Sequence, residues 1–195
     1  MVSEDEQELI KRAKEGDHRA FQTLVERHQR KAYTVAYGVL RDQDAAIDAT
    51  QDAFVKVFKS LPNFHGQSSF YTWLYRIVIN VCIDKKRKAA RSVEVEYDDS
   101  YMQSTEEPVA AMTLASTQID TPEQAYARSE LRRQMGAAMD TLSTSHRQIL
   151  VLREVQGMSY DELAETLELP RGTVMSRLFH ARKKFQHSLN HYLKT

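Results

Sequence analysis

Long apolar runs and cysteine are both scarce in this 195-residue sequence, and each scarcity excludes a class of protein. No run approaches the roughly 20 apolar residues that a membrane-spanning helix needs, so membrane insertion is not expected. The one cysteine, Cys82, cannot form an intramolecular disulfide and is typical of a reducing compartment. The N-terminal segment MVSEDEQELI is acidic and unlike a signal peptide, which favours a soluble, cytoplasmic protein.

Glycine and proline are scarce as well, with six and four residues, which favours long helices joined by few turns. No segment has a convincing strand pattern, and no internal repeat is present. We therefore predict an all-α fold. Cys82 lies beside an apolar face of one expected helix, so burial as a small hydrophobic residue is favoured over a redox role.

The formal charge is zero, but the charges are unevenly distributed along the chain. Residues 1–92 carry 16 basic and 12 acidic side chains, and residues 123–195 carry 11 basic and eight acidic ones. The segment 93–122 between them carries seven acidic side chains and no basic one. This pattern predicts two small, basic, helical domains at 1–92 and 123–195, joined by a flexible acidic linker.

Caps and apolar spacing predict the helices of both domains. Their ranges are 5–15, 17–40, 45–61 and 70–91, one that starts at Pro122, then 145–154, 160–167 and one that follows Pro170. Three of them have an apolar stripe at helical spacing: Ile47, Gln51, Phe54 and Phe58; Phe70, Trp73, Leu74, Ile77 and Val81; and Leu131, Met135, Ala138, Met139 and Leu142. The second of these stripes is expected to be buried and leaves Tyr71, Tyr75 and Ile79 outside it.

The most specific pattern is SYDELAETLELPRGTVMSRLFHARKKF, which predicts a helix-turn-helix. Ser159 and Glu162 form a capping box at the start of its first helix, and Pro170 ends the turn. The second helix has an apolar stripe, Val174, Leu178, Ala181 and Phe185, and an opposite face with Ser176, Phe179, His180 and Lys183, flanked by Arg177. Residues 171–195 include six basic and no acidic side chains, which suits the DNA major groove better than a merely solvated face.

The helix over 70–91 combines aromatic and basic residues on one side. Tyr71 and Tyr75 are interleaved with Arg76 and Asn80, and the basic run Lys85–Lys88 follows. Such a surface can hold unstacked bases and attract phosphates, although packing by a third element explains the tyrosines equally well. Because a duplex reader is predicted in the same chain, we expect the protein to act where a duplex is opened.

Three ordered motifs, DAAIDATQDAFVKVF, SSFYTWLYRIVINVCID and SYDELAETLELPRGTVMSRLFHAR, resemble the extracytoplasmic-function (ECF) group of bacterial sigma factors, closest to the sigma-E type. The resemblance covers nearly all of residues 8–188, apart from the linker. It implies a two-domain subunit that binds core RNA polymerase, at the clamp helices of the largest subunit and the flap of the second subunit. It also implies recognition of the −10 and −35 promoter elements, promoter melting, and transcription of a stress or envelope-response regulon.

The resemblance assigns residues to each of these duties. Core-polymerase binding falls to Asp48, Gln51, Asp52 and Phe54. The −10 element falls to Phe64, Tyr75, Arg76, Asn80, Lys85, Lys86 and Arg87, with the Asn80 amide expected to face a pocket under Phe64. The −35 element falls to Arg171, Thr173, Ser176, Arg177, Phe179, His180 and Lys183. Members of the group often carry a basic residue where this chain has Met175 and His180, so the exact −35 sequence stays open.

Residues typical of catalysis or cofactor binding are not brought together by any motif. We find no nucleophile arrangement, metal cluster or glycine-rich phosphate loop, so we expect neither an enzyme nor a cofactor or metal. An anti-sigma protein is expected to hold such a factor inactive. The acidic linker is compatible both with a strap through the polymerase and with a simple spacer.

Two other classes of protein deserve comparison. An autonomous dimeric repressor would keep the helix-turn-helix, but it would leave the aromatic and basic helix without a purpose, and it would bind a palindromic duplex without polymerase. A decoy that mimics a sigma factor to capture its regulator should lack a basic recognition helix, which this chain has.

Overall fold

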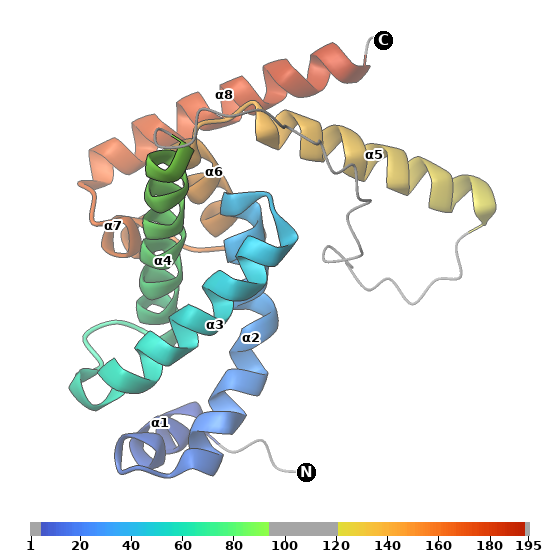
Figure 1. The fold of residues 1–195 in the computed structure, drawn as a ribbon. Coiled ribbons are helices and arrows are strands. Elements are labelled where there is room, and N and C mark those ends of the chain that lie inside the picture. The colour runs from blue at the N-terminus through green and yellow to red at the C-terminus, as the bar shows by residue number, and fades with distance from the viewer. Residues whose placement is uncertain (1–4, 94–120, 194–195) are drawn as a thin grey trace. The chain divides into compact units, whose positions relative to one another are not determined.

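The protein forms two helical domains, shown in Figure 1. This computed structural model describes residues 5–93 and 121–193, and every regular element in those two ranges is a helix. The all-helical, two-domain fold predicted from the sequence is therefore confirmed. The predicted acidic linker lies outside the described residues, except at its two ends.

The N-terminal domain is built from four α-helices and one short 3₁₀ turn. They are α1 (Glu6–Lys14), α2 (His18–Leu40), α3 (Gln43–Ser60), η1 (Leu61–Asn63) and α4 (Phe70–Val93). Aspartates cap three of them: Asp5 accepts from the N–H of Gln7, Asp17 from those of Arg19 and Ala20, and Asp42 from that of Ala45. Gly16 has a φ of +95°, a backbone conformation that favours glycine, and so allows the tight turn between α1 and α2.

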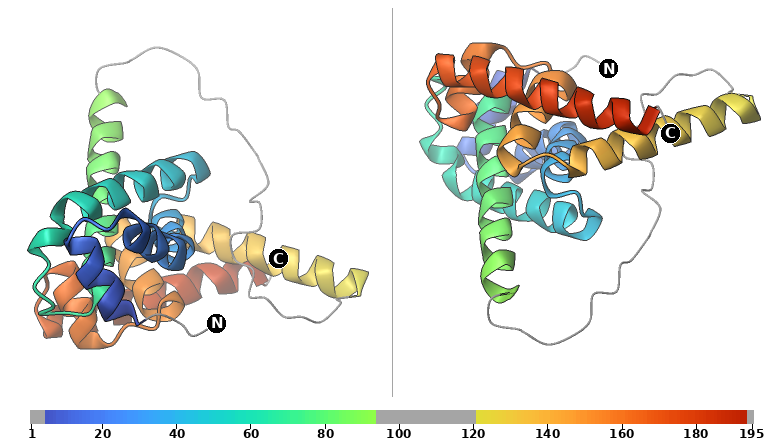
Figure 2. Two further views of the ribbon diagram at one scale, coloured as in Figure 1. Left: turned by 90° about the horizontal axis from the view of Figure 1, so that it is seen from below. Right: turned by 90° about the horizontal axis from the view of Figure 1, so that it is seen from above.

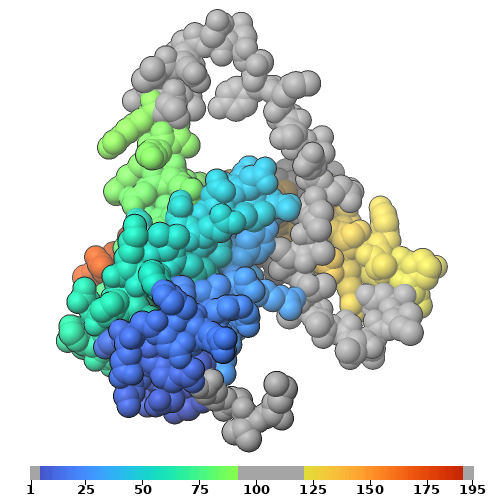
Figure 3. Space-filling view, turned by 60° about the horizontal axis from the view of Figure 1, so that its bottom comes forward, coloured from blue at the N-terminus to red at the C-terminus, as the bar shows by residue number. Residues whose placement is uncertain are grey.

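Helix α3 packs into this domain through small residues. Ala46, Ala49 and Ala53 are fully buried, and α3 contacts both α2 and α4. Val57 and Phe54 are buried beside these alanines, whereas other bulky residues of α3 lie on its outer side. Ile47 and Phe58 from the predicted stripe are exposed there. Figure 3 shows α1, α2 and α3 together on one face of the domain, with the last turns of α4 extending beyond them.

The burial of α4 differs from the predicted single stripe. Trp73 and Ile77 are only half-buried, whereas Tyr75 and Ile79, which were expected outside the stripe, are each 2% exposed. The prediction missed this because α4 contacts both α2 and α3, so its buried arc is wider than one stripe. Cys82 is completely buried in this arc, which confirms the expectation that it packs as a small hydrophobic residue.

The C-terminal domain also consists of helices. They are α5 (Pro122–Asp140), α6 (Thr144–Leu150), a π-helical turn η2 (Val151–Val155), α7 (Tyr160–Leu167) and α8 (Arg171–Leu193). A capping box between Thr121 and Gln124 starts α5, which runs beside α8 in the views of Figures 1 and 2. Leu131 of its predicted stripe is 47% exposed, because only the second half of α5 reaches the core, where Ala138 is buried.

Membrane insertion was not expected from the sequence. Within residues 5–93 and 121–193, no helix is both long and apolar enough to cross a bilayer.

Candidate protein and nucleic-acid interfaces

An apolar groove of about 410 Å³ runs between α2 and α3 on the surface of the N-terminal domain. Its apolar lining comes from Phe21, Val25, Phe54, Val55 and Phe58, and its polar lining from Gln29, Thr50 and Gln51. Val55 and Phe58 are 53% and 43% exposed, so two large apolar side chains of the groove are open to solvent. An exposed apolar surface with polar edges is typical of a site for another protein.

The predicted polymerase-binding residues lie on or beside this groove. Gln51 and Phe54 line it, and Phe54 is 9% exposed. Asp48 and Asp52 are exposed on α3, but neither is part of the groove lining. Aromatic rings rigidify one end of the groove, because the Phe58 ring lies 5.0 Å from that of Phe21 and 5.7 Å from that of His18.

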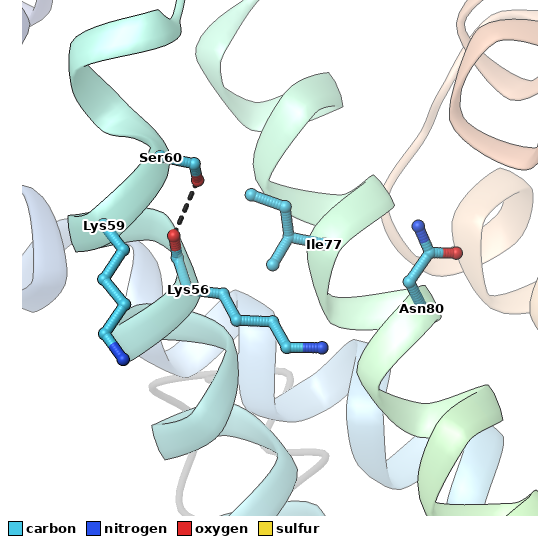
Figure 4. Close-up of a pocket in the computed structure, with 5 residues that line it drawn as sticks. All are labelled: Lys56, Lys59, Ser60, Ile77 and Asn80. Atoms are coloured by element: carbon cyan, nitrogen blue, oxygen red, sulfur yellow. Dashed lines mark hydrogen bonds between the residues drawn. The ribbon is translucent and has the colours of Figure 1, made fainter.

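A second hollow, of about 350 Å³, lies between α3 and α4 and is shown in Figure 4. Lys56, Lys59 and Ser60 of α3 line it together with Ile77 and Asn80 of α4. The Ser60 hydroxyl donates to the carbonyl oxygen of Lys56 at 2.6 Å. Two ammonium groups and an exposed amide beside an aliphatic side chain provide the chemistry to hold a nucleotide, since they offer charge, hydrogen bonds and an apolar contact.

Sequence reasoning found Asn80 but missed the three α3 residues of this hollow. Their spacing carried a signal, because positions 56, 59 and 60 share one face of a helix. That signal could not be interpreted without knowing that this face of α3 lies beside α4.

Phe64 is not among the residues that line the Asn80 hollow. Its ring packs against Phe70 and Trp73, with centroids 5.9 and 4.9 Å away, and its carbonyl accepts a 2.8 Å hydrogen bond from Lys14. The residue is 9% exposed and does not line the hollow. The expected placement of the Asn80 amide in a pocket under Phe64 is therefore not what this hollow shows.

Tyr75 does not lie on the open face of α4. Burial raises the pKa of its phenol to about 12, consistent with a side chain that is 2% exposed. The prediction that its ring is available on the surface is wrong in this structure. Arg76, the next residue, is half-buried, whereas Asn80 is exposed.

The basic run occupies the last turns of α4. Arg87 and Lys88 are exposed, and Lys85 and Lys86 are half-buried. The ammonium of Lys85 lies 2.8 Å from a carboxylate oxygen of Asp52 on α3, and that of Lys56 lies 3.6 Å from Asp84. Both ion pairs join α3 to α4 next to the hollow. The cation belongs to α4 in the first pair and to α3 in the second.

The helix-turn-helix matches its predicted boundaries. Ser159 and Glu162 form the capping box: each backbone N–H donates to the other's side chain, at 2.7 and 3.2 Å. Glu168 in the turn has a φ of +54°, and α8 starts directly after Pro170. Val174, Leu178 and Ala181 are buried as predicted, while Phe185 is half-buried.

The outer face of α8 is cationic and partly apolar. Ser176, Phe179, His180 and Lys183 are all exposed, as predicted, and Thr173 and Arg177 are half-buried. Arg171 is held by Asp161 of α7, with a 3.0 Å hydrogen bond between guanidinium and carboxylate. Met175 is 56% exposed on the same helix.

Comparison with known proteins identifies both domains. Residues 24–92 match sigma-70 region 2, and residues 132–185 match sigma-70, region 4. The RNA polymerase sigma-H factor of Pseudomonas aeruginosa is 35% identical over 194 residues, covering 100% of this chain and 98% of that protein. The ECF RNA polymerase sigma-E factor of Haemophilus influenzae is 33% identical over 184 residues, covering 94% and 95%. The chain belongs to the ECF family of RNA polymerase sigma factors.

A solved structure extends the likeness of this sigma factor to three dimensions. CnrH, determined in complex with the cytosolic domain of CnrY, has a TM-score of 0.59 and 27% identity, over 95% of this chain and 97% of that one. Sigma factors are transcription initiation factors rather than enzymes. In the described part of this sigma factor, no three His, Cys, Asp or Glu side chains are grouped as metal ligands would be.

One histidine of the sigma factor's C-terminal domain lies in a cationic setting. His146 of α6 faces α8, and burial lowers its pKa, as do the positive charges of Lys184 and Arg177 and the neighbouring His180. Its Nδ1 atom is buried without a hydrogen-bond partner. A neutral imidazole is therefore favoured at this position beside α8.

Proposed function

We propose that this sigma factor binds core RNA polymerase through the groove between α2 and α3, with the clamp helices of the largest subunit as its partner. The exposed apolar side chains of Val55 and Phe58 support this role, because burying them against another protein is favourable. Gln51 at the groove, with Asp48 and Asp52 nearby on α3, provides the polar edge that fixes the register of a partner helix.

The observation that carries the proposal is the position of α3. One side of α3 contributes Gln51, Phe54, Val55 and Phe58 to the apolar groove, and another contributes Lys56, Lys59 and Ser60 to the hollow beside α4. A single helix thus lies between a surface suited to a protein and a surface suited to a nucleotide. This arrangement fits a subunit that brings polymerase and an opened promoter together.

The hollow beside α4 is the proposed site for a base extruded from the −10 element. Extruding a base costs a few kcal/mol, which hydrogen bonds to its edge and contact with an apolar side chain can offset. The Asn80 amide offers a donor and an acceptor for the base edge, and Ile77 offers apolar contact. Lys56 and Lys59, with the basic run of α4, would hold the phosphates and so assist melting.

Helix α8 is the proposed reader of the −35 element in the major groove. Its exposed Ser176, Phe179, His180 and Lys183 would face the bases and phosphates, with Arg171, Thr173 and Arg177 at the edges. The flap of the second polymerase subunit is the proposed partner of this domain.

A protein regulator and a stress or envelope-response regulon complete the proposal. The apolar groove of a free sigma factor is exposed to water, and binding another protein would bury it. An anti-sigma protein in this groove would at the same time prevent polymerase from binding there. The relative CnrH was solved with the cytosolic domain of another protein, which supports a similar complex here. The cytoplasm, where polymerase works, is the proposed location.

Docking is tested by changing Gln51 and Asp52 together to Ala and measuring co-purification with core polymerase. The double variant should bind at least several-fold more weakly while keeping its helical content. The matched control changes Gln7 and Glu8, an exposed amide and carboxylate on α1, to Ala and should bind normally. Unchanged binding of the Gln51 and Asp52 variant would place the docking surface elsewhere.

The division between the two DNA surfaces is tested on duplex and pre-melted promoters. Asn80→Ala should relax the preference at one −10 position by roughly 1–3 kcal/mol on both templates, since it removes a direct base contact. Arg177→Ala should weaken −35-dependent binding and leave opening of the pre-melted promoter nearly unchanged. Equal losses for both variants on both templates would refute this division.

A further inference from the structure

Two large apolar side chains are exposed together on the DNA-facing helix. Met175 is 56% and Phe179 is 62% exposed, although α8 has its own buried stripe, formed by Val174, Leu178 and Ala181. Residues four apart on a helix are neighbours, so Met175 and Phe179 form one apolar patch. The core of the domain does not need this patch, since both side chains point away from it.

The surroundings of the patch are polar and cationic. Exposed Ser176, His180 and Lys183 lie on the same side of α8, and no acidic residue occurs from Arg171 to Leu193. The Phe179 ring packs edge to face against the His180 imidazole, with centroids 5.4 Å apart, which limits its rotation. The ligand that suits this surface carries negative charge and small apolar groups together.

Duplex DNA has this combination at thymine. The major groove is flanked by phosphates, and thymine is the base that presents a methyl group there, at C5. Met175 has only a weak acceptor and Phe179 has no hydrogen-bonding group, so neither side chain can read the edge of a G·C pair through strong hydrogen bonds. Contact with a methyl group is the discrimination that these two side chains can provide.

We propose that Met175 and Phe179 act as a pair that reads thymine methyl groups in the −35 element, and this inference rests on the proposed role of α8. Residues four apart rise about 6 Å along a helix, which corresponds to about two base-pair steps of 3.4 Å. The pair therefore specifies thymines within a segment of about three base pairs. Phosphate contacts by Lys183 contribute affinity without this sequence preference.

The test uses the full chain with core polymerase and deoxyuridine, which lacks only the methyl group of thymine. A preferred −35 sequence is first selected from a randomised duplex library, and each thymine is then replaced singly by deoxyuridine. Removing a contacted methyl should weaken binding about fourfold, because burying one such group contributes about 0.8 kcal/mol. Met175→Ala should abolish the penalty at one position and leave it at the other.

Two variants serve as controls. Met175→Leu keeps an apolar side chain of similar size and should retain both penalties. Leu131→Ala removes a similarly exposed apolar side chain from α5 and should behave as the unchanged protein. Holoenzyme formation is measured for every variant, so that a loss of folding or assembly is recognised.

Three results would overturn the inference. If no deoxyuridine weakens binding while Lys183→Ala does, α8 contacts the duplex but does not read methyl groups. If Met175→Ala impairs holoenzyme formation and leaves every deoxyuridine penalty in place, the patch contacts a protein instead. If neither deoxyuridine nor Lys183→Ala has an effect, the proposed −35 role of α8 itself is wrong.

Discussion

The ammonium nitrogen of Lys85 lies 2.8 Å from a carboxylate oxygen of Asp52 and so joins α4 to α3. The side chain of Lys85 is 29% exposed and that of Asp52 is 59% exposed. Partly solvated ion pairs contribute about 0–1 kcal/mol, so this pair orients two side chains more than it stabilises the fold. It links Lys85, proposed to contact DNA, with Asp52, proposed to contact polymerase. A substitution of either residue should therefore alter the position of the other side chain.

Salt dependence distinguishes the two roles. Lys85→Ala should reduce the slope of log affinity against log salt for promoter DNA by about one, because one phosphate contact is lost. Asp52→Asn should leave the slope unchanged or slightly steeper, since Lys85 is then released for phosphate. The slopes are measured by titrating labelled promoter DNA with holoenzyme at several salt concentrations. Lys11→Ala, on exposed α1, is the control, and an unaltered slope for Lys85→Ala would exclude the contact.

The capping box of the helix-turn-helix should stabilise the C-terminal domain. Ser159→Ala removes the hydroxyl that accepts from the Glu162 N–H and should lower the free energy of unfolding of that domain by about 1 kcal/mol. Denaturant unfolding of the full chain, followed with a probe in each domain, measures the effect. Ser129→Ala, at an exposed position within α5, should change the free energy by less than about 0.5 kcal/mol. Equal changes in the free energy of unfolding for Ser159→Ala and Ser129→Ala would show that the cap does not stabilise the domain.

Acid should destabilise the C-terminal domain partly through His146. Its pKa is lowered in the fold by burial and nearby positive charge, so below the ordinary value of 6.5 the unfolded chain takes up the proton first. Stability is therefore complete above that pH and falls as the pH drops toward the lowered pKa. When the pH is lowered from about 7.5 to about 5.5, the melting temperature of the His146→Gln variant should fall less than that of the unchanged protein.

His65→Gln is the control for this measurement, since His65 is exposed in the other domain. It should follow the unchanged protein at both pH values. If His146→Gln and His65→Gln give the same acid sensitivity, burial of His146 has no influence on stability.

Cys82 should be chemically inert in the folded protein. It is fully buried, and burial raises the pKa of its thiol to about 12 despite the opposing effect of Lys85 and Lys86. Because the thiolate is the reactive form, alkylation by iodoacetamide at neutral pH should be undetectable until the chain is unfolded. Rapid labelling of the native protein, at the rate seen in denaturant, would reopen a redox role.

Local signals account for what the sequence predicted well. The capping box at Ser159 and Glu162 and the break at Pro170 depend on neighbouring residues alone, so the helix-turn-helix was placed correctly. The burial of Tyr75 was missed because it depends on how many helices surround α4, which periodicity does not reveal. The hollow between α3 and α4 was not predicted for the same reason, since Lys56 and Ser60 come close to Asn80 only through the packing of α3 on α4.

The alanines that anchor α3 have a consequence for how this helix tolerates change. Ala49 and Ala53 are fully buried, so replacing either with Leu would overpack the interior and cost roughly 1–3 kcal/mol. Val55 is 53% exposed, so its replacement by a polar residue leaves the interior untouched, whereas replacing Phe58 also removes the ring contacts with Phe21 and His18. Substitutions on the outer side of α3 can therefore change what the helix binds while the domain still folds. Folding assays alone would not detect variants of this kind that can no longer direct transcription.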